Sequence, residues 1–314
     1  MAHCDSILCA RNRLSALFDI PQSKGKFMQY AAPETTAEAA RLLAESAGTA
    51  KVLAGGTDIL VQMKFGAGAP DLLVDIKRIA GMYDITAENG GYRVGAAVSG
   101  AELGEHAGMV ALWPGVVEAF ELIGSTQVQG RCTLAGNLCN ASPAADSVPA
   151  MVAAQAMARI VNPNGERDCA VQEIPVAPGK TSLAKGEFVA SIFFPARPEN
   201  ASDAYLRFIP RTEMDIAVCA AGVSLTFDTD GICTDARVSL GAVAATVLLV
   251  EDAANALIGT KLDDGALEAL GVACSAACNP IDDKRGTIEF RRDVTAVLAK
   301  RAAKIAQGRA GGKS

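Results

Sequence analysis

The chain has 314 residues and a formal net charge of −6, from 29 Lys and Arg against 35 Asp and Glu. Half of its residues are hydrophobic and a fifth are charged, a composition that excludes extensive disorder and favours a folded protein. The acidic balance, with no clustered basic face, argues against binding to nucleic acid or to an anionic membrane. The length allows two domains and a sizeable core.

The histidine and cysteine content limits the kinds of catalytic and metal site that the chain can form. His3 and His106 are the only histidines, so catalytic triads and histidine-based zinc sites are disfavoured and an enzyme would take its chemistry from a cofactor. Nine cysteines form no C-x-x-C pair, which indicates reduced thiols and a cytoplasmic protein. No apolar run is long enough for a membrane helix, and the first residues lack an apolar signal core.

The first half of the chain alternates predicted helices and strands. Residues 1–27 show weak periodicity and are expected to form a flexible leader. Thr35-x-x-Glu38 has capping-box spacing and begins a predicted helix that Gly48 would end. A short strand, 51–54, then enters a Gly-rich loop, after which 59–64 is predicted to be helical. Further strands are expected at 72–76, 92–96 and 188–194, helices at 114–123 and 143–156, and a hairpin that joins 158–161 to the residues from 167.

A Pro-, Asn- and Ser-containing stretch, 195–203, marks the predicted domain boundary. Beyond it, Asp228-Thr229-Asp230-Gly231 predicts a hairpin between 217–227 and 232–240. Helices are expected at 249–258, 264–277 and 288–307. This half is predicted to be a smaller α+β domain.

The first candidate site is the loop Ala54-Gly55-Gly56-Thr57-Asp58. Successive glycines let backbone N–H groups approach a ligand and form an anion-binding nest, which suits a pyrophosphate. The alternative is a tight turn from strand to helix. The loop matches neither the Rossmann nor the Walker pattern, which disfavours a nicotinamide or ATP fold.

The second candidate is the segment Thr133-Leu134-Ala135-Gly136-Asn137-Leu138-Cys139-Asn140-Ala141-Ser142-Pro143-Ala144-Ala145-Asp146. Its small residues, amides, hydroxyls and carboxylate suit hydrogen bonding to ribose and phosphate oxygens. Alternatively, Asn140 or Ser142 is a helix N-cap. From the residues alone, both interpretations stay open.

Taken together, the two segments and the stretch Arg207-Phe208-Ile209-Pro210-Arg211-Thr212-Glu213-Met214-Asp215-Ile216-Ala217 resemble the FAD-binding medium subunits of the molybdenum hydroxylases. This family includes the medium subunit of carbon monoxide dehydrogenase and the flavin domain of xanthine dehydrogenase. The resemblance covers roughly residues 28–305. It implies an α+β fold, with a two-lobed FAD-binding domain of the vanillyl-alcohol-oxidase (PCMH) type and a small α+β C-terminal domain. The implied divisions are a leader 1–27, lobes at about 28–82 and 83–197, a C-terminal domain 204–308 and a tail 309–314.

The resemblance also implies where FAD is bound. The backbone from Val52 to Ile59 would cradle the pyrophosphate, with Thr57 and Asp58 nearest the diphosphate and flavin, and Asp58 and Ile59 beside the reactive edge. Thr133 and Asp146 would contact the phosphate and adenosine side. Arg207 stands where some relatives have Lys, which keeps the charge but changes its geometry. The full implied set is Val52, Leu53, Ala54, Gly55, Gly56, Thr57, Asp58, Ile59, Ile123, Thr133, Gly136, Asn137, Asp146, Val189 and Arg207.

The sequence departs from one branch of this family. Relatives that reduce aromatic acyl-CoA thioesters carry an inserted cysteine-rich loop for a 4Fe–4S cluster. Here Cys132 and Cys139 are the only cysteines between residues 82 and 160, and such a cluster usually needs four thiolates. We therefore expect no cluster and no metal in this subunit, and we expect Cys274-x-x-x-Cys278 to pack in a core. Neither His106 nor Cys139 suits a covalent link, so FAD is expected to be bound non-covalently.

The resemblance predicts an oxidoreductase subunit without catalytic side chains of its own. It would accept electrons singly from 2Fe–2S clusters in a small partner subunit and pass them to an acceptor, while a large partner carries molybdopterin, in a heterohexamer of three chain types. The alternatives are a stand-alone flavin oxidase of the vanillyl-alcohol type and a flavin-free assembly subunit. The sequence does not identify the organic substrate, the final acceptor, the stoichiometry, or whether Met1 or Met28 is the true start.

Overall fold

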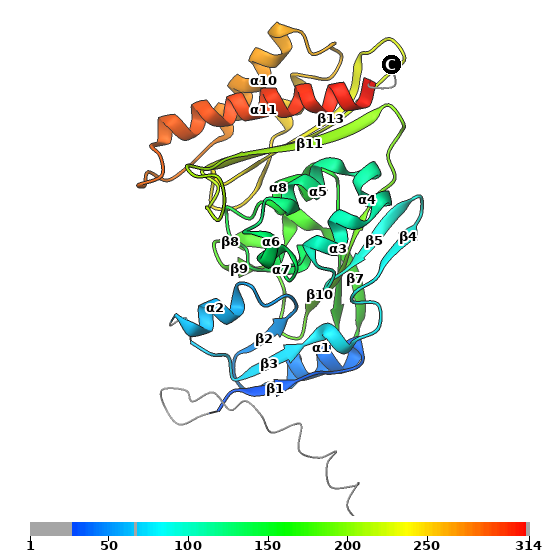
Figure 1. The fold of residues 1–314 in the computed structure, drawn as a ribbon, viewed down its shortest axis with the longest axis vertical. Helices are drawn as coiled ribbons and strands as arrows, with labels where there is room; N and C mark the ends of the chain where they lie inside the picture. The colour runs from blue at the N-terminus through cyan, green and yellow to red at the C-terminus, as the bar shows by residue number, and fades with distance from the viewer. Residues whose placement is uncertain (1–26, 66–67, 312–314) are drawn as a thin grey trace, which may run out of the picture.

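The computed structural model describes residues 27–65 and 68–311. Three parts follow one another along the long axis of the molecule: a small lobe, a second lobe with an antiparallel sheet, and a C-terminal layer of sheet and helices (Figure 1). The predicted leader lies outside the described residues except for Phe27. None of the helices in the described ranges combines the length and apolar character needed to cross a membrane.

The small lobe is built on a parallel sheet with strand order β1-β3-β2. Thr35 caps α1 as predicted, because its side chain accepts a hydrogen bond from the Glu38 N–H. Gly48 does not end this helix: α1 stops at Glu45, and the N–H of Ser46 closes the last turn on Leu42. The elements are β1 (Gln29–Ala31), α1 (Thr36–Glu45), β2 (Ala50–Leu53), α2 (Ile59–Lys64), β3 (Leu72–Asp75) and the 3-10 turn η1 (Ile76–Arg78).

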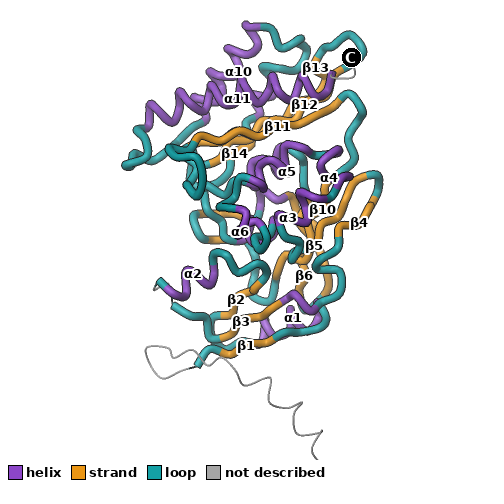
Figure 2. Tube along the Cα trace, viewed as in Figure 1, coloured by secondary structure: helices purple, strands orange, loops and turns teal. Residues whose placement is uncertain are grey.

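The second lobe is a five-stranded antiparallel sheet, ordered β4-β5-β10-β6-β7, with helices packed against it (Figure 2). The predicted hairpin is present, with Asn162 opposite Gly165 where β6 turns into β7. The predicted helix at 143–156 begins only at Ser147, because 140–146 form turns after α7. The elements are β4 (Ile85–Glu88), β5 (Gly91–Gly95), α3 (Gly100–Glu105), α4 (Ala107–Leu112), α5 (Pro114–Glu121), α6 (Thr126–Gln129), α7 (Leu134–Cys139), α8 (Ser147–Ala153), β6 (Met157–Asn162), β7 (Gly165–Ala170), η2 (Val171–Glu173), β8 (Pro175–Ala177), β9 (Lys180–Thr181) and β10 (Phe188–Phe194).

The C-terminal layer is a four-stranded antiparallel sheet, ordered β11-β12-β13-β14, that is covered on both faces. Helix α11 packs on β11 and β12, while α5 and α8 of the second lobe pack against β11, β12 and β13. Gly222 lets α8 approach closely, because a Cβ there would lie 2.8 Å from the Pro149 carbonyl oxygen. The elements are β11 (Ala201–Phe208), β12 (Cys219–Phe227), β13 (Cys233–Gly241), β14 (Leu248–Leu249), α9 (Glu251–Asn255), α10 (Asp264–Ala277) and α11 (Ile288–Gly311).

The expected boundary at 195–203 is partly strand, because β11 already begins at Ala201. Burial explains the difference: Ala201, Ser202 and Asp203 are all buried, so this polar-looking stretch enters the sheet rather than forming an exposed linker. Proline and asparagine mark only its first residues.

Candidate functional site

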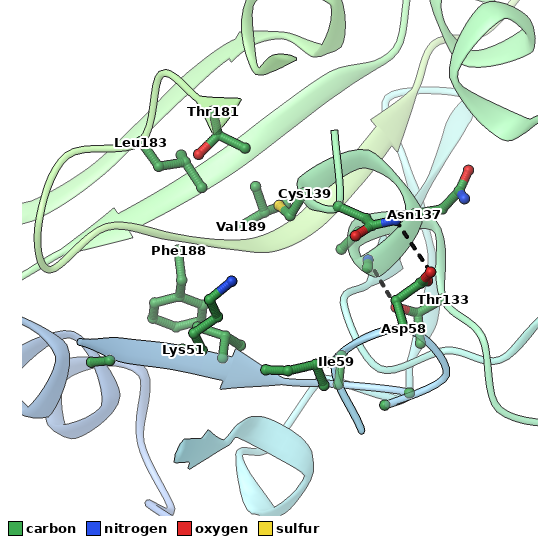
Figure 3. Close-up of a pocket in the computed structure, with 18 of the residues that line it drawn as sticks. Lys51, Asp58, Ile59, Thr133, Asn137, Cys139, Thr181, Leu183, Phe188 and Val189 are labelled. Atoms are coloured by element: carbon green, nitrogen blue, oxygen red, sulfur yellow. Dashed lines mark hydrogen bonds between the residues drawn. The ribbon is translucent and has the colours of Figure 1, made fainter. Parts of the chain in front are cut away.

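A cavity of about 490 Å³ lies between the small lobe and the second lobe. The loop after β2 and the start of α2 form one wall, α7 forms another, and the chain from Gly179 to Val189 closes the third. In Figure 3, Lys51 and Ile59 approach it from the small lobe, while Thr181, Leu183 and Val189 approach it from the second lobe. The cavity therefore brings together segments that are far apart in the sequence.

The Gly-rich loop that lines this cavity contains backbone donors without acceptors among the described residues. Among the described residues, no acceptor is present for the N–H groups of Gly55, Gly56, Thr57 and Asp58, and all four residues line the cavity. Gly56 has φ +82°, a conformation that favours glycine. A run of unpaired N–H groups in such a loop is the arrangement that binds anions.

Gly55 is where the two predicted motifs meet. A Cβ at Gly55 would lie 1.9 Å from the carbonyl oxygen of Arg131, so only glycine lets the loop pack against the chain that leads into Thr133. Both motifs thus face one cavity because their backbones touch.

The second motif forms the start of α7. The Thr133 hydroxyl accepts a hydrogen bond of 2.9 Å from the Gly136 N–H and caps the helix. The side-chain oxygen Oδ1 of Asn137 accepts a 2.6 Å hydrogen bond from the Ser147 hydroxyl, which ties α7 to α8. Neither Asn140 nor Ser142 caps α8, whose first turn has no side-chain cap.

Asn140 joins the two motifs through side chains. Its amide group donates to Asp58 at 3.2 Å and its carbonyl oxygen accepts from the Gln62 amide at 2.9 Å. Asp58 stays accessible along the cavity, but partial withdrawal of its carboxylate from water raises its pKa. This carboxylate, the nearby free N–H groups and the amides of Asn140 and Gln62 give this end of the cavity its polar character.

The structure brings most of the expected site residues together. Those that line the cavity are Val52, Ala54, Gly55, Gly56, Thr57, Asp58, Ile59, Ile123, Thr133, Gly136, Asn137 and Val189.

Three expected residues are not part of the cavity lining. Leu53 points to the opposite side of β2, where it packs with Met28 and Leu73, because side chains alternate along a strand. Asp146 and Arg207 are buried against each other: Arg207 Nη1 lies 2.5 Å from Asp146 Oδ2, and the Tyr205 hydroxyl donates to Asp146 Oδ1 at 2.9 Å. Their contact with FAD stays a prediction.

Burial has the largest effect on the pKa of Asp146 in its pair with Arg207. Desolvation raises the pKa of Asp146 to about 6, although the Arg207 charge and the hydrogen bonds from Tyr205 and Arg207 act in the opposite direction. The Nε of Arg207 is buried without an acceptor among the described residues. The pair thus links the second lobe to β11.

Sequence reasoning missed several residues of the cavity. Asn140 belongs to the second motif and was expected either to bind ligand oxygens or to cap a helix, but its hydrogen bonds to Asp58 and Gln62 of the small lobe were not foreseen. Lys51, Phe188 and the stretch 179–187 carry no motif, so no local signal could have assigned them to the site.

The thiols near the cavity are poor nucleophiles. Burial raises the pKa of Cys139 to about 12 and that of Cys132 to about 11, so both remain protonated at neutral pH. Cys274 and Cys278 are buried in the C-terminal core, as predicted. Within the described parts of the chain, no three His, Cys, Asp or Glu side chains converge as they would around a metal ion.

Most of the chain matches proteins of one family. A family model described as "FAD binding domain in molybdopterin dehydrogenase" matches residues 25–197, and "CO dehydrogenase flavoprotein C-terminal domain" matches residues 204–306. The chain is 30% identical over 289 residues to the xanthine dehydrogenase FAD-binding subunit of Escherichia coli O157:H7, covering 91% of this chain and 98% of that protein. It is 31% identical over 281 residues to the carbon monoxide dehydrogenase medium chain of Afipia carboxidovorans, covering 90% and 97%.

A solved structure agrees with these matches. A chain of the reconstituted CO dehydrogenase from Oligotropha carboxidovorans superposes with a TM-score of 0.86 at 31% identity, over 92% of this chain and 99% of that chain. The expected fold class, an FAD-binding domain followed by a small C-terminal domain, is thereby confirmed. The chain belongs to the family of FAD-binding subunits of molybdopterin dehydrogenases, which are oxidoreductases.

Proposed function

We propose that this chain is the FAD-carrying electron-transfer subunit of a multi-subunit molybdenum hydroxylase. The observation that supports it most is that Gly55, Gly56, Thr57 and Asp58, whose N–H groups have no acceptor among the described residues, line a cavity shared with the Thr133 helix start. A diphosphate is an anion that such a nest can hold. We also propose the domain divisions 28–197 and 204–308, which lie close to the two family matches at 25–197 and 204–306.

The residues present fit FAD. The Gly-rich loop offers donors for the pyrophosphate, and the cavity also reaches Val52, Lys51 and Phe188, beyond that loop. FAD, when bound, supplies the capacity to accept and release electrons. The protein would hold the cofactor in place, limit its contact with water and set the polarity around it through Asp58.

Binding without a covalent bond is part of the proposal. A covalent flavin needs a nucleophilic side chain beside the ring, and the high pKa values of Cys132 and Cys139 oppose that role. Denaturing the protein with acid and separating the supernatant by chromatography should release intact FAD, one per chain. Flavin that stays with the precipitate would contradict this part of the proposal.

The proposed partners are a large molybdopterin subunit and a small 2Fe–2S subunit. Relatives are described as medium chains or as a subunit of a dehydrogenase complex, and one similar structure is a Cu,Mo-CO dehydrogenase. These names support a division of labour in which the organic substrate reacts in another chain. We place the complex in the cytoplasm on the strength of the cysteine content.

Rapid-mixing spectroscopy separates this relay from a stand-alone oxidase. The purified chain should keep its flavin oxidised with aromatic alcohols, aldehydes or heterocycles, yet bleach with a chemical reductant, while the assembled complex should bleach with its hydroxylase substrate. Direct bleaching of the single chain by an organic substrate at a useful rate would favour the oxidase. A purified chain that binds no flavin at all would favour a structural subunit.

A further inference from the structure

A hydrogen-bonded network lies beneath the Gly-rich loop, at the edge where all three parallel strands of the small lobe end. Tyr30 comes from β1, Asp75 ends β3, and Ala54 follows β2. Ligands of open parallel sheets bind outside this carboxyl edge. A network at this place can therefore act on the loop that continues from β2.

Lys77 connects the network to the loop. Its ammonium group donates to the Ala54 carbonyl oxygen at 3.1 Å and lies 2.7 Å from Asp75 Oδ1. The Tyr30 hydroxyl donates to Asp75 Oδ2 at 2.7 Å, and the Lys77 N–H donates to Asp75 Oδ1 at 3.0 Å. Each partner is thus fixed by another partner in the same network.

At neutral pH, Asp75 is ionised and Tyr30 is protonated, and these charge states preserve the hydrogen bonds of the network. Burial alone would raise the pKa of Asp75, but the hydrogen bonds from Lys77 and Tyr30 outweigh it and hold that pKa below its usual value. Burial and the hydrogen bond to Asp75 raise the pKa of Tyr30 to about 12. Asp75 is therefore an acceptor and Tyr30 a donor throughout the neutral range.

The geometry of one peptide bond explains how Lys77 can orient a backbone N–H of the Gly-rich loop. The last residue pair between β2 and β3 is Leu53 with Asp75. Lys77 donates to the carbonyl oxygen of Ala54, the first residue after this pair on the β2 side. The peptide between Ala54 and Gly55 is planar and trans, which makes its C=O and N–H point in opposite directions. Holding the carbonyl toward Lys77 turns the Gly55 N–H away from it, as a donor of the cavity-lining loop.

We propose that Lys77 is a positioning residue that holds the Gly-rich loop ready for the diphosphate of FAD. The inference rests on the proposed function. Lys77 and Asp75 are oppositely charged, so their contribution is the fixed orientation of a peptide rather than a net positive charge. A free loop would have to be ordered when the ligand binds, at a cost in affinity.

The test compares Lys77→Met with Lys304→Met, which makes the same charge change on the exposed side of α11. Flavin is removed, and FAD binding is titrated by quenching of flavin fluorescence. Hydrogen exchange of the amides from Ala54 to Asp58 is followed on the same flavin-free proteins. Lys77→Met should weaken FAD binding about tenfold and speed exchange in this segment several-fold, while Lys304→Met leaves both within about twofold of the wild type.

A double variant excludes the simplest alternative explanation. Lys77→Met leaves the Asp75 carboxylate without its cation near an anion site, so repulsion alone could weaken binding. Asp75→Asn with Lys77→Met removes that charge. The double variant should remain about tenfold weaker than the wild type; recovery to within about twofold would overturn the positioning role.

The remaining outcomes are also decisive. Unchanged affinity or unchanged loop exchange in Lys77→Met would overturn the inference, because positioning requires both to change. If Lys77→Met does not fold, Tyr30→Phe decides: it removes one hydrogen bond to Asp75 and should weaken FAD binding about threefold with faster loop exchange, and no change in either would overturn the inference. Failure of the wild type to bind FAD would instead refute the proposed function.

Discussion

Gly55 shows how a single residue without a side chain can join two functional segments. Its backbone lies so close to the Arg131 carbonyl that a Cβ would approach it to 1.9 Å, far inside normal contact. The obstacle is main chain, which cannot move aside as the end of a flexible side chain could. The two walls of the cavity keep their spacing only if this position remains glycine.

Gly55→Ala should therefore abolish FAD binding or weaken it at least about a hundredfold, because one of the two segments has to shift. Fluorescence titration of flavin-free protein with FAD measures the effect. Gly308→Ala is the matched control: it lies in α11, where an added Cβ meets nothing within 4 Å, and alanine favours helix. FAD binding by Gly55→Ala that equals the wild type would show that the close contact is not needed.

At the scale of elements, α7 depends on its surroundings. It has only six residues, Leu134–Cys139, and helices of this length are not stable alone in water. Its cap at Thr133 and its buried side chains Leu134, Ala135 and Leu138 hold it in place. The start of α7 also forms the cavity wall, so the helix cap and the site depend on the same hydroxyl.

Thr133→Ala should lower the free energy of unfolding by about 1 kcal/mol, the usual cost of losing a side-chain cap, and should also weaken FAD binding. Thr133→Ser keeps the accepting oxygen and should restore most of both. Urea denaturation and FAD titration measure the two effects separately. Equal behaviour of the alanine and serine variants would mean that the hydroxyl contributes little.

At the scale of the whole molecule, the C-terminal sheet lies between α11 and the helices of the second lobe, and a buried ionic cluster joins them. Asp203 accepts from Arg197 at 3.0 Å and from the Val116 N–H of α5 at 3.2 Å. Arg309 of α11 donates to the Asp203 carbonyl oxygen at 2.9 Å. Burial raises the pKa of Asp203 to about 6, partly offset by Arg197.

Arg197→Met should lower the free energy of unfolding by about 3–5 kcal/mol at pH 8, the usual cost of leaving a buried charge unpaired. Loss of Arg197 raises the pKa of Asp203 further, so the carboxyl is protonated more readily as the pH falls. The penalty should therefore be clearly smaller at pH 5 than at pH 8, with wild type measured at each pH.

The exposed pair of Arg41 with Glu45 provides the control for this prediction. Arg41→Met should cost about 1 kcal/mol or less at both pH values. Denaturant unfolding of flavin-free protein measures all three proteins. A loss in Arg197→Met that is the same at pH 5 and pH 8 would contradict the role assigned to Asp203.

The sequence alone was sufficient wherever a signal acts over a few residues. The cap at Thr35, the turn at 162–165, the buried strand 188–194 and the Gly-rich loop follow from local preferences for caps, turns and glycine conformations. The order of the three motifs along the chain was also enough to indicate the family. Local signals predicted the ends of elements less well: Gly48 does not end α1, which stops at Glu45, and α8 begins at Ser147 rather than at 143.

Only the tertiary structure decided which distant residues meet. Asp146 and Arg207 pair with each other across 61 positions, and residues between 179 and 187 line the cavity without any motif. Lys77 contacts Ala54 across 23 positions. The free energy of burying and pairing such groups depends on neighbours that the packing supplies, so no pattern along the chain could assign it.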